Sequence, residues 1–122
     1  MAKWRIEIPE WNPTTLNKLL SAHWAARGRM KKKDAMIIRE YATISGVTPA
    51  ENVRRKVRMT YIIKAKSRAK FPDEDNVWKS LLDGLKHAKA IHDDSPDWLV
   101  KDPVIYAKAE TNRTIIELED VA

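Results

Sequence analysis

Residues 73–90, DEDNVWKSLLDGLKHAKA, decide the fold because their apolar side chains recur at the spacing of a helix. The apolar members fall on one arc of that helix: Val77, Trp78, Leu81, Leu82, Leu85 and Ala88. Asp75, Lys79 and Asp83 recur every four residues on a second, polar arc. Because such a helix buries its apolar arc, the stretch predicts an amphipathic helix from Asp75 to about Ala90, packed on another layer.

Segments before and after this helix have the alternating pattern of strands. Trp4–Ile8 alternates apolar and charged residues. In the later segment, the apolar Val57, Met59, Tyr61 and Ile63 alternate with the polar Arg58, Thr60 and Lys64. Val104–Ala109 and Thr114–Leu118 are separated by the turn residues Thr111-Asn112. This last pair predicts a β-hairpin.

A second helical region lies between the first two strands. Helical spacing runs over residues 16–24, Gly28 interrupts it, and the helix resumes over residues 36–44. Trp24 falls in this apolar pattern and is expected in the core. Trp11 and Trp98 are the better candidates for surface tryptophans that stack on bases.

The segments between these elements, residues 47–53 and the acidic stretch 92–102, are predicted to be loops. The element order is then β-α-β-α-β-β. This order predicts a mixed α/β (α+β) fold, a single domain over residues 1–122 with one mixed sheet packed by helices.

Composition narrows the class of protein. The 122 residues carry a net charge of +6 and no cysteine, which excludes disulfides, thiolate zinc sites and cysteine nucleophiles. No stretch approaches the roughly 20 apolar residues of a membrane helix, and the charged N-terminus is unlike a signal peptide. We therefore expect a cytoplasmic protein without a membrane partner.

Charge is also segregated along the chain. No acidic residue stands between Glu51 and Asp73, an interval rich in lysine and arginine, and a second basic run spans residues 27–33. The acids gather next to the first interval. A basic surface beside an acidic cluster is typical of a protein that binds a polyanion next to a metal site.

The acidic residues have a spacing that suits a divalent ion. Asp73 and Asp75 enter the predicted helix, and Asp93-Asp94 follows its far end. Carboxylate oxygens are the ligands that Mg²⁺ and Mn²⁺ prefer, and such an ion activates water for phosphodiester hydrolysis. Lys79, one turn after Asp75, is placed to hold a phosphate, with Asp83 orienting it.

Each of these features also has a plainer interpretation. Asp73 or Asp75 is explained equally well as a helix cap. Lys79 and Asp83 are compatible with a solvated ion pair, and Asp93-Asp94 with an ordinary turn. Taken one at a time, the residues leave these alternatives open.

Taken together, the same residues resemble the RusA family of Holliday junction resolvases of bacteria and their phages. The family carries Asp-x-Asp-Asn-x-x-Lys at the start of a helix, an Asp within that helix and an Asp-Asp pair at its end. The matching residues here are Asp73-Glu74-Asp75-Asn76-Val77-Trp78-Lys79, then Asp83, then Asp93-Asp94. The spacing from Asp75 to Asp94 also agrees with the family.

The resemblance implies a magnesium-dependent endodeoxyribonuclease, with Mn²⁺ as a substitute, that resolves four-way junctions by paired nicks. The metal-binding and catalytic carboxylates carried over are Asp73, Asp75 and Asp94, and the further catalytic residue is Lys79. The residues expected to support them are Asn76, Asp83 and Asp93. The resemblance also implies a homodimer, and a two-fold dimer presents two identical sites to a nearly two-fold symmetric junction.

The expected DNA contacts come from the basic runs and from an asparagine that follows a proline near the N-terminus, as in the family. They are Asn17, Arg27, Arg29, Lys31, Lys32, Lys33, Arg68 and Lys70. Some family members have consecutive arginines just before the first Asp, whereas this chain has Arg68-Ala69-Lys70-Phe71-Pro72. Phosphate contacts there are expected to differ.

Three other functions compete with this one. The first is a non-catalytic DNA-binding protein of recombination or phage replication that keeps only the basic surface. The second is a nuclease of the class with Pro-Asp and a strand-borne Asp/Glu-x-Lys, of which Pro72-Asp73 supplies only half. The third is a basic adaptor whose acidic loop binds a protein and which does not respond to metal.

Overall fold

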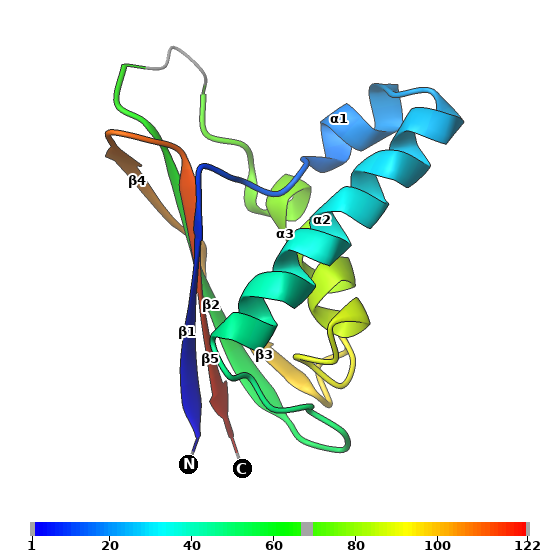
Figure 1. Ribbon diagram of the computed structural model, residues 1–122, viewed down its shortest axis with the longest axis vertical. Helices are drawn as coiled ribbons and strands as arrows, with labels where there is room; N and C mark the ends of the chain where they lie inside the picture. The colour runs from blue at the N-terminus through cyan, green and yellow to red at the C-terminus, as the bar shows by residue number, and fades with distance from the viewer. Residues whose placement is uncertain (1, 67–69, 122) are drawn as a thin grey trace.

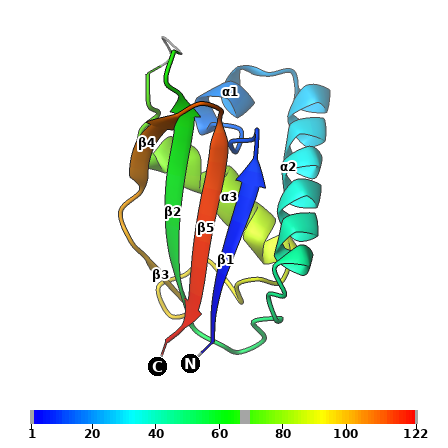
Figure 2. The same ribbon diagram turned by 60° about the vertical axis from the view of Figure 1, so that its left-hand side comes forward.

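One layer of helices covers one face of a mixed sheet, and the other face of the sheet is open (Figures 1 and 2). The computed structural model describes residues 2–66 and 70–121, and of residues 16, 17 and 19 it describes the backbone alone. Over these residues the elements are β1 (Lys3–Pro9), α1 (Leu16–Ser21), α2 (Trp24–Ile44), β2 (Arg55–Lys64), α3 (Glu74–His87), β3 (Leu99–Lys101), β4 (Ile105–Ala109) and β5 (Arg113–Asp120). The predicted α+β class with one mixed sheet is confirmed.

The sheet has the strand order β1-β5-β2, with β3 and β4 both along the outer edge of β2. β5 runs antiparallel to β1 and to β2, whereas β3 and β4 run parallel to β2. The parallel pairs follow from the connection through α3, because a helix lets the chain return to the same end of the sheet. β3 lies within the stretch 92–102, where the sequence predicts only a loop.

The predicted hairpin is wrong, although both of its strands form. β4 pairs with one edge of β2 and β5 with the other, so that β2 lies between them. Strands on either side of a third are about 9.6 Å apart, a gap that residues 110–112 can cross. The side-chain oxygen of Asn112 accepts a hydrogen bond from the backbone N–H of Lys64 at 2.8 Å, which holds this link over the end of β2.

The predicted interruption of the second helical region is real but lies elsewhere. α1 ends at Ser21 and α2 begins at Trp24, so the break precedes Gly28. His23 caps α2, with its Nδ1 accepting from the N–H of Ala25 at 3.3 Å. Gly28 stays helical because one glycine costs a helix only about 1 kcal/mol relative to alanine.

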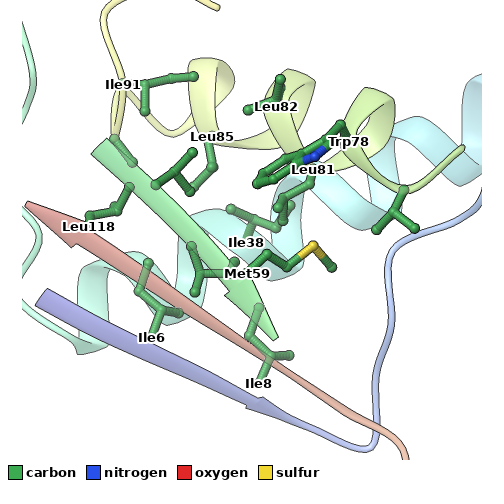
Figure 3. Packing of buried hydrophobic residues seen from close by; sticks show 14 of the residues in the cluster. Ile6, Ile8, Ile38, Met59, Trp78, Leu81, Leu82, Leu85, Ile91 and Leu118 are labelled. Carbon is green, nitrogen blue, oxygen red and sulfur yellow. The ribbon is translucent and has the colours of Figure 1, made fainter. Parts of the chain in front are cut away.

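The hydrophobic core fills the space between the sheet and the helices α2 and α3 (Figure 3). From β2 it takes the inward side chains Val57, Met59, Tyr61 and Ile63. From α3 it takes most of the predicted apolar arc: Val77, Trp78, Leu81, Leu82 and Leu85. Gly84 of α3 lies against Ile38 of α2, and a Cβ at Gly84 would overlap the Cδ1 of Ile38. The two helices therefore cross closely at a glycine.

Candidate functional site

Asp73 and Asp75 lie at the start of α3, as predicted. Asp73 occupies the N-cap position, yet its side chain makes no capping hydrogen bond, and only its backbone carbonyl accepts from the N–H of Asn76 at 3.0 Å. Asp75 lies in the first helical turn, and both side chains are exposed. The capping interpretation of Asp73 thus lacks its hydrogen bond, which leaves the carboxylate oxygens available to a cation.

The turn that carries these carboxylates is attached to the edge of the sheet. The hydroxyl of Tyr106 on β4 donates to the carbonyl of Pro72 at 2.6 Å. The carboxylate of Glu74 accepts from the backbone N–H of Val104 at 2.6 Å. Sequence reasoning missed both residues. Glu74 stands at the variable position of the motif, and the partners of both lie about 30 residues away in the chain.

Lys79 and Asp83 follow on the solvent side of α3. Their side chains form an ion pair at 3.6 Å between Nζ and Oδ2, and the lysine is about half exposed. Asn76 is half-buried in the first turn. The exposed pair matches the solvated interpretation, and it also holds Lys79 one helical turn beyond Asp75.

Asp94 lies at the other end of α3. Its Oδ2 is 3.5 Å from the Nζ of Lys86 in the last turn of the helix. Asp75 and Lys86 are eleven positions apart on α3, which corresponds to about 16 Å along the helix axis. Figure 2 shows α3 running diagonally behind the sheet, so that its two ends are well separated.

Asp93 is stabilised in its ionised form beside Asp94. The backbone N–H of Asp94 lowers the pKa of the Asp93 carboxyl, and hydrogen bonding from Ser95 and the charge of Lys86 act in the same direction. The carboxylate is therefore ionised at neutral pH. Nearby, His92 accepts at Nδ1 from the N–H of Asn52 at 3.1 Å and packs on Trp98, which orders this loop.

The three predicted ligands do not converge within one chain. Asp73 and Asp75 share one end of α3, and Asp94 lies at the other. In the ranges 2–66 and 70–121, no three histidine or acidic side chains gather in a set that could hold a metal ion. Within one chain, Asp94 therefore lies apart from the Asp73/Asp75 pair.

The basic run of residues 27–33 lies on α2 next to α3. Because successive helical residues point about 100° apart, the run surrounds α2 and cannot form one stripe. Lys31 and Lys32 line a groove between the two helices, and Asp83 and His87 line it from α3. Arg29 and Lys33 are exposed, and Arg27 is half-buried, donating through Nη2 to the carbonyl of Ala22 at 3.3 Å.

The basic interval between Glu51 and Asp73 has fewer side chains free to bind DNA than its composition suggests. Arg55 is fully buried and pairs with Asp120 at 2.9 Å. Lys56 and Arg58 both pair with Asp102, at 3.4 and 3.2 Å. Of the eight basic residues in this interval, Arg55, Lys56 and Arg58 thus neutralise acids of β5 and of the connection between β3 and β4.

Two of the predicted DNA contacts fall outside what the structure describes. Arg68 lies outside the described residues, and so does the side chain of Asn17. Lys70, just before the acidic turn, is exposed.

The tryptophan exposed to solvent is not one of those expected. Trp24, predicted to be in the core, is 76% exposed at the start of α2. Trp11 is partly buried, and its Nε1 donates to the buried carboxylate of Asp34 at 3.3 Å. Trp98 is also partly buried, against His92. Periodicity identified the helix correctly but not which side of it is covered.

These features define a class: an α+β protein with two exposed carboxylates at a helix start beside a basic helix. The chain matches the family model described as Endodeoxyribonuclease RusA over residues 20–119. This chain belongs to the RusA endodeoxyribonuclease family. No curated protein matches it. In the part of the chain that the structure describes, no helix is long and apolar enough to cross a membrane.

Proposed function

We propose that this protein is a metal-dependent endonuclease that resolves four-way DNA junctions by paired nicks, acting as a homodimer. The observation that carries the proposal is the exposed Asp73/Asp75 turn at the start of α3, a helix that packs on the basic helix α2, in a chain of an endodeoxyribonuclease family. The carboxylates are suited to bind a cation, and the lysines of α2 are suited to bind phosphates.

The residues of the turn fit a hard divalent ion. Asp73 and Asp75 offer exposed oxygens, and Asp73 spends none of them on capping α3. Mg²⁺ needs only one or two protein carboxylates, because it keeps several waters and takes phosphate oxygens as well. When bound, such an ion neutralises phosphate charge and lowers the pKa of water. Mn²⁺ has the same preference for oxygen ligands.

Lys79 and the α2 lysines have separate roles in this proposal. Lys79 is exposed one turn beyond Asp75, where its ammonium can contact the phosphate to be cut. Asp83 orients Lys79 through their ion pair. Lys31 and Lys32 bind the DNA backbone next to the site, and exposed Lys70 approaches it from the other side of the turn.

The position of Asp94 at the far end of α3 supports the proposed homodimer. In a two-fold dimer each contact occurs twice, with the two residues exchanged between the subunits. If the α3 helices of two copies lie antiparallel, Asp94 of one copy meets Asp73 and Asp75 of the other, at both ends. Each junction strand then meets one complete set of carboxylates.

The test is subunit complementation with Asp75→Asn and Asp94→Asn. Each variant alone should lose nicking of a synthetic four-way junction in Mg²⁺ by roughly 100-fold or more, because a ligand to the ion is gone. Asp75→Asn should keep or tighten junction binding, since it removes a negative charge near phosphate. A co-refolded mixture should regain nicking, because one site of the mixed dimer keeps every carboxylate.

The outcomes separate the hypotheses. If the mixture stays inactive although both variants fold and bind junctions, each site belongs to one chain. A wild-type protein that binds junctions but does not nick them in Mg²⁺ or Mn²⁺ would favour the alternative, a non-catalytic DNA-binding protein. That alternative draws on the separation of Asp94 from the other carboxylates within one chain.

A further inference from the structure

The turn that carries Asp73 and Asp75 is joined by two hydrogen bonds to β4 and to Val104, the residue just before β4. Tyr106 on β4 holds the carbonyl of Pro72, the residue just before Asp73. Glu74, just after Asp73, holds the N–H of Val104, just before β4. The two hydrogen bonds therefore bracket Asp73 on both sides, and both partners belong to one short stretch at the edge of the sheet.

Aromatic packing supports the first of these hydrogen bonds. The ring of Phe71 lies 5.0 Å from that of Tyr106, and Tyr61 of β2 meets Tyr106 edge-on at 6.1 Å. Burial raises the pKa of the Tyr106 hydroxyl, and the carboxylates of Glu74 and Asp73 raise it further. The hydroxyl therefore stays protonated, and able to donate, throughout the pH range in which nucleases act.

A helix start needs such support when it carries metal ligands. The first N–H groups of a helix have no partners within it, so the first turn is held weakly. Asp73 lends no side-chain capping bond to this turn. Two carboxylates held close together also repel each other until a cation binds. The bonds to Tyr106 and Glu74 oppose any opening of the turn.

We propose that Tyr106 and Glu74 are positioning residues that hold the Asp73/Asp75 turn in its metal-binding conformation. The inference rests on the proposed function. Neither residue is assigned to contact the ion or the DNA. Both act through the backbone on either side of Asp73, so their loss should weaken metal binding before it weakens DNA binding.

The experiment compares Tyr106→Phe with Tyr41→Phe, which removes a hydroxyl from α2, away from the turn. For Tyr106→Phe, we expect kcat for junction nicking to fall about tenfold, the equivalent of one lost hydrogen bond. The half-saturating Mn²⁺ concentration should rise by a similar factor, in nicking and in direct Mn²⁺ binding by EPR. Junction binding in EDTA should stay within about twofold of wild type, and Tyr41→Phe should match wild type throughout.

A second pair of variants separates the hydrogen bond of Glu74 from its charge. Glu74→Gln keeps an oxygen acceptor for the N–H of Val104 and should bind Mn²⁺ as wild type does. Glu74→Ala removes the acceptor and should behave like Tyr106→Phe. Equal loss of metal affinity in both Glu74 variants would mean that the charge, and not the hydrogen bond, matters.

Several results would overturn the proposal. One is a Tyr106→Phe variant whose kcat and Mn²⁺ affinity equal those of a wild type that nicks normally. That result would leave the proposed function intact. Another is a fall in both junction binding and thermal stability without a change in metal affinity. That result would indicate a general structural role for Tyr106. If the wild type itself neither nicks nor binds Mn²⁺, the proposed function fails and this inference fails with it.

Discussion

At the scale of single residues, DNA binding depends on which charged side chains the fold leaves exposed and unpaired. The same residue type has different roles in different places. Arg55 is buried in ion pairing and hydrogen bonds, whereas Lys32 lies exposed in the groove between α2 and α3. Counting basic residues along the chain treats both alike. The separation of structural from available charge is therefore a property of each residue's surroundings.

Lys32→Ala tests whether the α2 groove binds DNA. Junction affinity should fall modestly, and the slope of log affinity against log salt should drop by about one counterion, because one phosphate contact is lost. The measurement is a salt titration of binding in EDTA. Lys3→Ala is the matched control, since Lys3 lies on β1 and pairs with Glu119 at 3.5 Å. Equal slopes for wild type and Lys32→Ala would place the DNA elsewhere.

At the scale of elements, the positions of the helices depend on how closely they pack. α2 carries the basic run and α3 carries the carboxylates, so their crossing sets the distance between the groups proposed to bind phosphate and those proposed to bind the metal ion. That crossing depends on Gly84, which lies against the fully buried Ile38. A residue outside the catalytic chemistry thus helps to set the geometry of the site.

Gly84→Ala should destabilise the protein by up to about 2 kcal/mol. Overpacking at Ile38 costs about 1–3 kcal/mol, from which the better helix propensity of alanine subtracts about 1. Urea unfolding measures the change. Ile38→Val removes the overlapping methyl, so the double variant should recover part of the loss. Gly28→Ala is the control, because a Cβ there meets nothing within 4 Å. It should leave stability unchanged or raise it.

At the scale of the whole molecule, one buried cation joins segments that are far apart in the chain. Arg55 on β2 pairs with Asp120 of β5 and donates from Nη1 to the carbonyls of Thr48 and Ala90, at 2.7 and 2.9 Å. Its guanidinium also lies 4.2 Å from the ring centroid of Trp4. This cluster fixes the segment that follows α3, which leads to Asp94.

Stability should fall as the pH rises above about 10. Burial raises the pKa of the Tyr61 hydroxyl, and Tyr106 shares that direction. Above the ordinary pKa of tyrosine the unfolded chain loses protons that the folded protein keeps, so rising pH favours unfolding. Urea unfolding at pH 9 and 10.5 should show a smaller fall for Tyr61→Phe than for wild type. An equal fall in both proteins would contradict this assignment.

Local pattern was enough to predict the helical regions, every strand except β3, and one half of the candidate site. The amphipathic arc of α3 predicts its burial, and the motif predicts Asp73 and Asp75 together, because they are two positions apart at one helix start. The same reasoning fails for Asp94, since its distance from them depends on the path of the chain after α3. It also fails for Tyr106 and Glu74, whose partners are remote in the sequence.

The sequence by itself determined the strands β1, β2, β4 and β5, the amphipathic helix, the α+β class and the family resemblance, because each depends on residues close together in the chain. Only the tertiary structure decided that β2 separates β4 from β5, that Trp24 is exposed and that Arg55 is buried. It alone shows that the chain after α3 keeps Asp94 beside Lys86 and does not return it to Asp73 and Asp75. The physical reason is that strand partners, solvent exposure and the meeting of distant side chains depend on packing between segments, which no local periodicity records.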